Sequence, residues 1–374
     1  MKTAFIYSSR YLDFDYGASH PMKTERLRMT YELCRAYGLL EMPETMLVEA
    51  VPAREDEVLR FHKAGYVEVL KKASQGLIDE HYAYGLGPGD NPVFPGVWEW
   101  SLLQSGASLQ CARLVADGKV RIAFNIAGGL HHAQESHASG FCYLNDPVLA
   151  ILELLERGCR VMYVDVDAHH GDGVQWAFYS DPRVLTISFH QDGRTLFPGT
   201  GHIVETGNSV GKGYAVNLPL LPGTDDDAFW HGFRGIVPRL MAAFRPDVVV
   251  AQLGADAFRD DPLANLELTT NGLCRVVAYL RDQAPALVAL GGGGYDVDAV
   301  ARAWTLAWAL MNNIELPAEL PAVPIAGLKT GRTLLRDPEH HSHAHAQCLR
   351  RVEQCLRHLE ANLFPLLEGE RQER

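Results

Sequence analysis

Hydrophobic residues along this chain fall into short runs that are nearly continuous rather than alternating. A typical run is Val248-Val-Val-Ala-Gln-Leu, in which β-branched residues directly follow one another. Continuous apolar runs of this length are typical of strands covered on both faces, as in a parallel sheet. The runs predicted to be strands are residues 3–7, 121–126, 160–166, 184–190, 247–253 and 286–290.

Segments with helical periodicity lie between these runs and alternate with them. They are residues 97–117, 146–158, 226–244, 271–283 and 297–312. Alternating strands and helices predict an α/β fold, here a single domain whose mainly parallel sheet is sandwiched by helices. In such folds ligands bind beyond the carboxyl ends of the strands, so we expect the active site there.

The composition changes after Asn313, where Pro, Leu and Ala become frequent. We therefore predict a catalytic domain over residues 1–313. Residues 314–374 are expected to form a C-terminal extension that packs on the same domain and contains a helix near residues 346–364. Two stretches rich in Gly and Pro, residues 82–96 and 191–213, are expected to form walls of a binding site, because long loops in compact domains commonly serve function.

The charge of the chain narrows its possible partners. Its 374 residues carry a formal net charge of −12, which disfavours nucleic acid and anionic membranes as partners. Seven cysteines without a Cys-x-x-Cys pair indicate free thiols in a reducing compartment. No apolar run is long enough to span a membrane, so we expect a cytoplasmic protein and leave its oligomeric state open.

Ligand-type side chains gather where the predicted strands end. Asp165, Asp167 and His169 close the strand that begins at residue 160, and Asp256 follows the strand that ends at Leu253. The first three share parity, so an extended backbone would point them to one face. Two carboxylates and one imidazole, from Asp167, His169 and Asp256, would leave an open position on a divalent metal, the catalytic pattern. The alternative is that Asp167 and His169 only cap the following helix.

Two further groups of residues, elsewhere in the chain, suggest catalytic chemistry. His131 and His132 follow a Gly-Gly turn and are candidates for a base and an acid, with Asp165 and Asp172 as orienting partners. Tyr295 follows four consecutive glycines, where its hydroxyl could donate to a developing oxyanion. The alternative for His131 and His132 is that they are ordinary loop histidines. The alternative for the glycines is a flexible turn, and the alternative for Tyr295 is ordinary packing.

These residues together resemble the arginase-like histone deacetylase superfamily, which includes classical zinc-dependent deacetylases and bacterial deacetylase-like and acetoin-utilisation proteins. The resemblance covers roughly residues 5–312. The motifs that carry it are His20-Pro-Met-Lys with Arg26, Gly128-Gly-Leu-His-His-Ala, Gly140-Phe-Cys-Tyr-Leu-Asn-Asp, Asp165-Val-Asp-Ala-His-His-Gly-Asp-Gly-Val-Gln, Phe197-Pro-Gly-Thr-Gly, Gly254-Ala-Asp-Ala and Gly291-Gly-Gly-Gly-Tyr.

The resemblance implies a zinc-dependent deacetylase that hydrolyses acetylated amines, such as acetyl-lysine, and releases acetate. It implies one Zn²⁺ per chain, with Fe²⁺ as the alternative metal, held by Asp167, His169 and Asp256. The implied catalytic residues are His131, His132, Asp165, Asp172 and Tyr295, with His132 as the general base and Tyr295 polarising the carbonyl. Arg26 matches an arginine at an internal channel beneath the metal.

The same resemblance implies a narrow substrate tube and structural potassium. The substrate-binding residues would be Asp90, Gly140, Phe141, Phe197 and Leu263. A potassium ion would be held by side-chain or backbone oxygens of Asp165, Asp167, His169, Ser188 and Phe189. A second potassium site is expected around Phe178, Asp181, Val184 and Tyr214.

Three alternatives remain open from the sequence. The first is an acetylpolyamine amidohydrolase. The second is a manganese amidinohydrolase of the arginase kind, which would need two metals and more bridging carboxylates than the one dense segment here provides. The third is a non-catalytic protein that binds acetylated amines, which the complete set of expected catalytic positions argues against.

Overall fold

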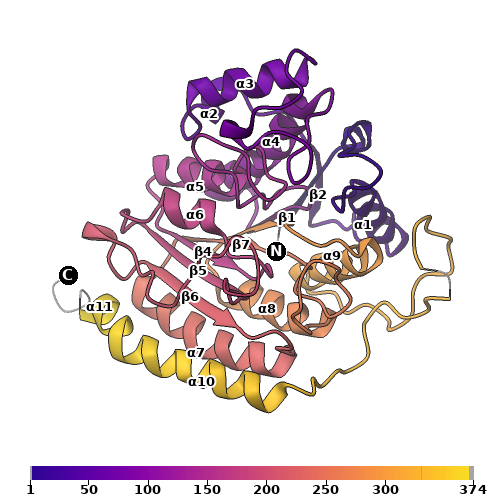
Figure 1. Ribbon diagram of the computed structural model, residues 1–374. Coiled ribbons are helices and arrows are strands. Elements are labelled where there is room, and N and C mark those ends of the chain that lie inside the picture. Colours follow the sequence, from indigo (N-terminus) through magenta and orange to yellow (C-terminus); the bar gives the residue numbers. More distant parts are fainter. Residues whose placement is uncertain (1, 330, 370–374) are drawn as a thin grey trace.

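In the computed structural model, which describes residues 2–329 and 331–369, strands and helices alternate around one sheet (Figure 1). The described chain forms an eight-stranded sheet in the order β2-β1-β3-β8-β7-β4-β5-β6, and every neighbouring pair is parallel. The predicted α/β fold is therefore confirmed. The strands are β1 Thr3–Tyr7, β2 Thr45–Glu49, β3 Ile122–Asn125, β4 Val161–Asp165, β5 Val184–Gln191, β6 Ala215–Leu220, β7 Val248–Gln252 and β8 Leu287–Leu290.

Helices cover both faces of the sheet. Figure 1 shows α2 to α6 above the strands, α7, α8 and α10 below them, and α9 to the right, packed against α1. The helices are α1 Glu25–Ala36, α2 Glu55–Val58, α3 Ala64–Ser74, α4 Val97–Ala116, α5 Asp146–Glu156, α6 Asp172–Ala177, α7 Asp226–Phe244, α8 Thr270–Gln283, α9 Val297–Met311, α10 His345–Asn362 and α11 Phe364–Gly369. Short 3₁₀ turns lie at η1 Ser9–Asp13, η2 Tyr82–Tyr84 and η3 Ser209–Gly211.

The central strands are buried because helices cover both faces of the sheet. All residues of β4 and β7 are buried, which explains their continuous apolar sequences. Local signals fix where helices begin. The side chain of Asn145 accepts a hydrogen bond from the Val148 amide at the start of α5, and Asp225 does the same for the Ala228 amide in α7.

Both edge strands, β2 and β6, were missed by the sequence prediction. In β2, Met46 and Leu47 are exposed, so the strand lacks the buried pattern of its neighbours. In β6 the sequence contains Asn217 and Pro219, and proline is tolerated only at sheet edges or bulges because it cannot donate to the ladder. The helices α1, α3 and α6 were also not among the predicted elements.

The C-terminal extension lies against the same body. Helix α10 runs along α7 and reaches β6, and Val352, Cys355 and Leu359 bury its inner face. Residues 330 and 370–374 of the extension lie outside the described residues. The division of the chain at Asn313 stays a prediction.

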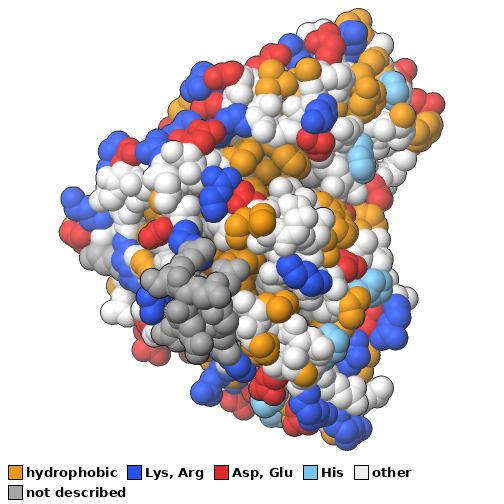
Figure 2. Space-filling model, turned by 90° about the vertical axis from the view of Figure 1, so that its left-hand side faces the viewer, with side chains coloured by type: hydrophobic (Ala, Val, Ile, Leu, Met, Phe, Trp, Pro, Cys, Tyr) orange, Lys and Arg blue, Asp and Glu red, His pale blue; other side chains and the backbone are white. Residues whose placement is uncertain are grey.

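The surface carries charges of both signs. On the face shown in Figure 2, Lys and Arg side chains are interspersed with Asp and Glu side chains around smaller hydrophobic areas. Within residues 2–329 and 331–369, no helix combines the length and apolar character needed to cross a membrane.

Candidate metal centre and active site

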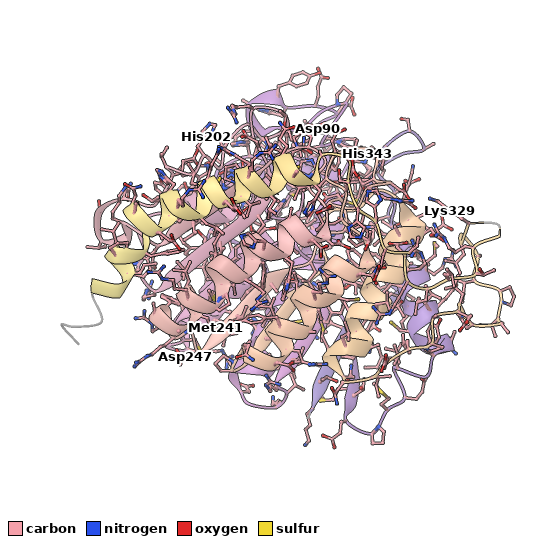
Figure 3. All side chains as sticks on the ribbon, turned by 90° about the horizontal axis from the view of Figure 1, so that it is seen from below. Asp90, His202, Met241, Asp247, Lys329 and His343 are labelled. Atoms are coloured by element: carbon pink, nitrogen blue, oxygen red, sulfur yellow. The ribbon has the colours of Figure 1, made fainter. Side chains whose placement is uncertain are left out.

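The candidate site residues lie where four neighbouring strands end. Strands β3, β8, β7 and β4 are consecutive in the sheet, so the loops that follow them meet at one edge although they are far apart in sequence. Figure 3 shows Asp90, His202 and His343 along one side of the molecule, and Met241 and Asp247 toward the opposite side. Asp247 immediately precedes β7, so it marks the amino end of the strands.

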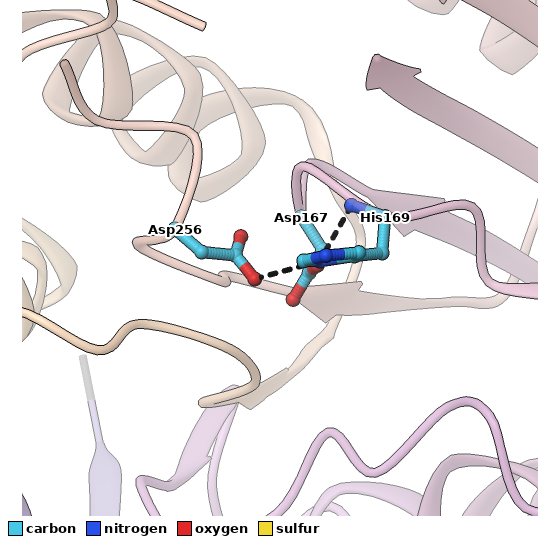
Figure 4. Close-up of side chains that lie close together, drawn as sticks. All are labelled: Asp167, His169 and Asp256. Atoms are coloured by element: carbon cyan, nitrogen blue, oxygen red, sulfur yellow. Dashed lines mark hydrogen bonds and ion pairs between the residues drawn. The ribbon is translucent and has the colours of Figure 1, made fainter. Parts of the chain in front are cut away.

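Asp167, His169 and Asp256 form a compact buried group at this edge (Figure 4). Each side chain offers one donor atom, and these atoms lie within 4.8 Å of one another. His169 Nδ1 is 3.1 Å from Asp167 Oδ1 and 3.0 Å from Asp256 Oδ2. The structure thus brings together the three residues that the sequence suggested as metal ligands; we call them the Asp–His–Asp group.

Hydrogen bonds from backbone amides hold the two carboxylates of this group. The His169 amide donates to Asp167 Oδ1, and the Ala168 amide donates to Asp256 Oδ1. The Gly293 amide donates to Asp167 Oδ2 at 2.9 Å, and a Cβ at Gly293 would lie 1.9 Å from Asp256 Oδ2. The close approach of the two loops therefore requires glycine at this position.

Gln252 was not identified from the sequence, although it contacts this group directly. It ends β7 and is fully buried. Its Nε2 donates to Asp167 Oδ2 at 2.7 Å and to the Gly129 carbonyl at 3.2 Å. A glutamine inside an apolar strand run gives no spacing signal, which is why the motifs did not reveal it.

Asp165, Asp167 and His169 do not share one extended strand, contrary to the sequence prediction. Strand β4 ends at Asp165, and the chain bends immediately afterwards, with the Asp167 amide donating to Asp165 Oδ1. Asp165 consequently faces His131, while Asp167 and His169 face Asp256. The convergence comes from the loop conformation rather than from an extended strand.

The tandem histidines are each held by a carboxylate. His131 Nδ1 is 2.7 Å from Asp165 Oδ2, and His132 Nδ1 is 2.7 Å from Asp172 Oδ1. The two Nε2 atoms lie 3.1 Å apart. If both Nδ1 atoms donate to their carboxylates, the Nε2 lone pairs face each other, and one shared proton between them satisfies both.

The electrostatic surroundings shift the pKa values of the two imidazoles in opposite directions. Burial lowers the pKa of His131, but the charges of Asp165 and Asp167 outweigh burial and raise it to about 9. Burial and the neighbouring His131 charge lower the pKa of His132 to about 4. Within this pair, these surroundings favour the proton on His131 over His132.

The loop that carries the histidines is anchored from α5. Asp146 Oδ2 accepts from the Gly129 amide at 3.0 Å, and Asp146 Oδ1 accepts from the Leu130 amide at 2.8 Å. Burial raises the pKa of Asp146 to about 6. Asn145 Nδ2 donates to the carbonyls of His131 and Ala133. Sequence reasoning assigned these two residues to a family motif without a role.

A cavity of about 190 Å³ opens onto the group. All five residues expected to bind substrate contribute to its wall, together with His132, His169 and Tyr295. The lining residues are Asp90, His132, Gly140, Phe141, His169, Leu196, Phe197, Leu263 and Tyr295.

Aromatic rings and one glycine set the width of this cavity. The Phe197 ring lies edge-on to His132 with centroids 5.0 Å apart, and the Phe141 ring lies edge-on to Tyr295 at 5.5 Å. A Cβ at Gly140 would lie 2.5 Å from His132 Cδ2 and 2.9 Å from the Phe197 ring. Glycine there keeps the passage between the rings open.

Two of the residues suggested for potassium, Asp167 and His169, belong to the Asp–His–Asp group itself. Ser188 and Phe189 are in β5, and Ser188 pairs in register with Asp165 of β4. Ser188 Oγ lies 2.9 Å from His190 Nδ1. Around the second suggested position, the Asp181 amide donates to the Phe178 carbonyl, and the Val184 amide donates to the Asp181 carbonyl. Both potassium sites stay predictions.

The donor set of the Asp–His–Asp group fits a catalytic divalent metal. Two carboxylate oxygens and one imidazole nitrogen leave positions for water and substrate. The ion-pair partners of Asp167 and Asp256 are the histidines 131 and 169. Burial and the charge of Asp167 raise the pKa of Asp256 to about 6, so a bound cation would relieve the repulsion between the two carboxylates.

A parallel α/β sheet with this group, two carboxylate-held imidazoles and a tyrosine around one cavity defines a hydrolase-type enzyme site. Residues 20–311 match the histone deacetylase domain. The chain is 40% identical to histone deacetylase RPD3 of Saccharomyces cerevisiae over 324 residues, which cover 86% of this chain and 74% of that protein. It is 42% identical to histone deacetylase B of Dictyostelium discoideum, over 86% of this chain and 76% of that protein. It is also 42% identical to histone deacetylase 3 of Oryza sativa subsp. japonica, where the match covers 63% of the rice protein. The chain belongs to the histone deacetylase family and is a deacetylase.

Proposed function

We propose that the protein removes acetyl groups from lysine side chains of proteins or peptides by zinc-dependent hydrolysis. The observation that carries the proposal is the cavity lined by His169, His132 and Tyr295, because His169 is also a member of the Asp–His–Asp group. The names of the relatives point the same way, since all those described above are histone deacetylases. They lend no support to the acetylpolyamine alternative.

Asp167, His169 and Asp256 would hold the metal, with Zn²⁺ as the proposed ion and Fe²⁺ as the alternative. A divalent ion in such a group supplies Lewis acidity, which polarises a carbonyl and lowers the pKa of water. Gln252 and the Gly293 amide would keep the Asp167 carboxylate in place.

The protein's own side chains would perform the proton transfers. His132 lines the cavity and is held through Nδ1 by Asp172, which supports a role in which its Nε2 would take a proton from the attacking water. Tyr295 would donate a hydrogen bond to the carbonyl oxygen as negative charge develops on it. A protonated histidine of the pair would then give its proton to the leaving amine, so that amide and water become amine and acetate.

The narrow, aromatic-walled cavity suits an acetyl group on a slender aliphatic stem. Phe141 and Phe197 would flank the stem, and Leu263 and Gly140 would complete the wall, with Asp90 at the rim holding substrate backbone. The net charge of −12 would favour basic peptides weakly and in a salt-dependent manner. Structural K⁺ at the two described positions and a catalytic unit over residues 1–313 belong to the same proposal.

The test is a deacetylation screen on one purified sample, with acetyl-lysine peptides, an acetylated polyamine and a small acetylated amine. We expect acetate release from the acetyl-lysine peptides with the highest kcat/KM. Faster turnover of the polyamine would reassign the substrate. Binding of the peptides without acetate release, in protein that contains metal, would favour a non-catalytic binding protein.

A further inference from the structure

The carboxyl group of Asp261 contacts the backbone of two residues that line the cavity. Asp261 lies in the loop after β7, five residues beyond Asp256, and is buried. Its Oδ2 accepts a hydrogen bond from the Tyr295 amide at 2.8 Å, and its Oδ1 accepts one from the Leu263 amide at 2.9 Å. One side chain therefore joins the loop after β7 to the loop after β8.

The peptide group that joins Gly294 to Tyr295 forms hydrogen bonds through both its carbonyl and its amide. Its carbonyl, on Gly294, accepts from Arg26 Nη1 at 2.9 Å, and its amide donates to Asp261. This peptide ends a run of four glycines, in which Gly292 and Gly294 have φ values of +123° and +135°. A glycine run has little intrinsic stiffness, so contacts from outside the loop must fix its end.

We propose that Asp261 is a positioning residue that sets the placement of the Tyr295 phenol relative to the Asp–His–Asp group. It acts through the backbone of Tyr295, and it also holds the backbone of Leu263, a second residue of the cavity wall. The inference rests on the proposed function, because it assigns Asp261 a role in the reaction that Tyr295 assists. Displacement of a catalytic group by about 1 Å can cost on the order of 100-fold in rate.

The decisive substitution is Asp261→Asn, which keeps the size of the side chain. An amide offers one oxygen and one NH₂ group, so one of the two backbone amides loses its acceptor in either orientation. We expect kcat to fall about 10–100-fold with metal content unchanged. The matched control is Asp260→Asn, because Asp260 is exposed and forms an ion pair with its neighbour Arg259 at 3.5 Å; its kcat should stay within about 2-fold of the unsubstituted protein.

A double-mutant cycle separates positioning from general loosening. The readout is the affinity for a peptide whose acetyl-lysine amide is replaced by a methyl ketone, which the enzyme cannot cleave. In the unsubstituted background Asp261→Asn should weaken this affinity about 10-fold, and in a Tyr295→Phe background by less than about 3-fold. Equal losses in both backgrounds, or an unchanged kcat in Asp261→Asn, would overturn the proposal while leaving wild-type deacetylation intact.

A measurement on the unsubstituted protein covers the case in which Asp261→Asn does not fold. A buried hydrogen bond to a carboxylate predicts that the Tyr295 amide proton exchanges slowly with solvent. Hydrogen exchange resolved at this amide should show strong protection. Exchange at the rate of an exposed loop would contradict the contact, whatever the enzyme's activity.

Discussion

Gln252 connects the Asp–His–Asp group to the loop that carries the tandem histidines. Its amide donates to Asp167 and to the Gly129 carbonyl from inside β7. In Gln252→Leu, Asp167 Oδ2 loses this donor while side-chain volume is nearly kept. Loss of such a supporting hydrogen bond typically costs about 10–100-fold in metal affinity. Competition with a chelator measures that affinity, and Gln75→Leu, at an exposed position, should leave it unchanged.

Tyr295 should affect turnover without affecting metal binding. Tyr295→Phe removes only the hydroxyl, and the Phe141 contact can persist because the ring remains. Loss of one oxyanion donor costs on the order of 100-fold or more in kcat. Steady-state kinetics and elemental analysis of the same sample provide the check. A variant with full activity would remove Tyr295 from the mechanism.

Among the strands and helices, the sequence predicted those whose residue pattern reflects their burial, and it missed those whose pattern does not. The apolar run of β7 predicted a buried strand, and Asp256 just beyond it was correctly expected near Asp167 and His169. Strand β6 was missed although all of its residues are buried, because Asn217 and Pro219 interrupt its apolar run. Asp261 and Gln252 act through contacts between loops and strands that are remote in sequence, so no local spacing could indicate them.

The helices above the sheet are joined by a charge cluster around Glu153 of α5. Its carboxylate contacts Arg113 of α4, Arg157, and Arg60 near α2. Burial acts to raise the pKa of Glu153, but the three guanidinium groups outweigh burial and lower it to about 2. Because the pKa in the folded state lies below the unfolded value, this stabilisation is present above about pH 4.5 and is lost as the pH falls toward 2.

Glu153→Gln should therefore destabilise the protein at neutral pH and much less in acid. After allowance for solvent around the arginines, we expect a loss of about 1–2 kcal/mol in the free energy of unfolding at pH 7. The difference from the unsubstituted protein should shrink between pH 5 and pH 3, as measured by urea unfolding. Glu156→Gln removes a 60% exposed partner of Arg60 and should change stability little at either pH. A difference that does not vary with pH would refute the assignment.

At the scale of the whole molecule, the C-terminal extension is tied to the catalytic body through Asp337. Asp337 Oδ1 accepts from buried Arg302 of α9 at 2.7 Å, and Asp337 Oδ2 accepts from the Thr270 amide of α8 at 3.0 Å. Asp337→Ala removes one of the acceptors of the buried Arg302 guanidinium, which keeps Asp298 and the Leu335 carbonyl, so the loss of this charged hydrogen bond should cost about 1.5–3 kcal/mol. Urea unfolding and limited proteolysis near residue 329 should show lower stability and faster cleavage. Glu339→Ala, at an exposed neighbouring position, should behave like the unsubstituted protein.

Metal content is the sharpest test of the proposed metal centre, because the Asp–His–Asp group draws its donors from two separate strand ends. Elemental analysis of the purified protein should give about one zinc or iron ion per chain. Asp256→Ala should lose most of that metal, since Asp167 and His169 alone supply too few donors. A normal metal content in Asp256→Ala, or two metal ions per unsubstituted chain, would contradict a single metal held by Asp167, His169 and Asp256.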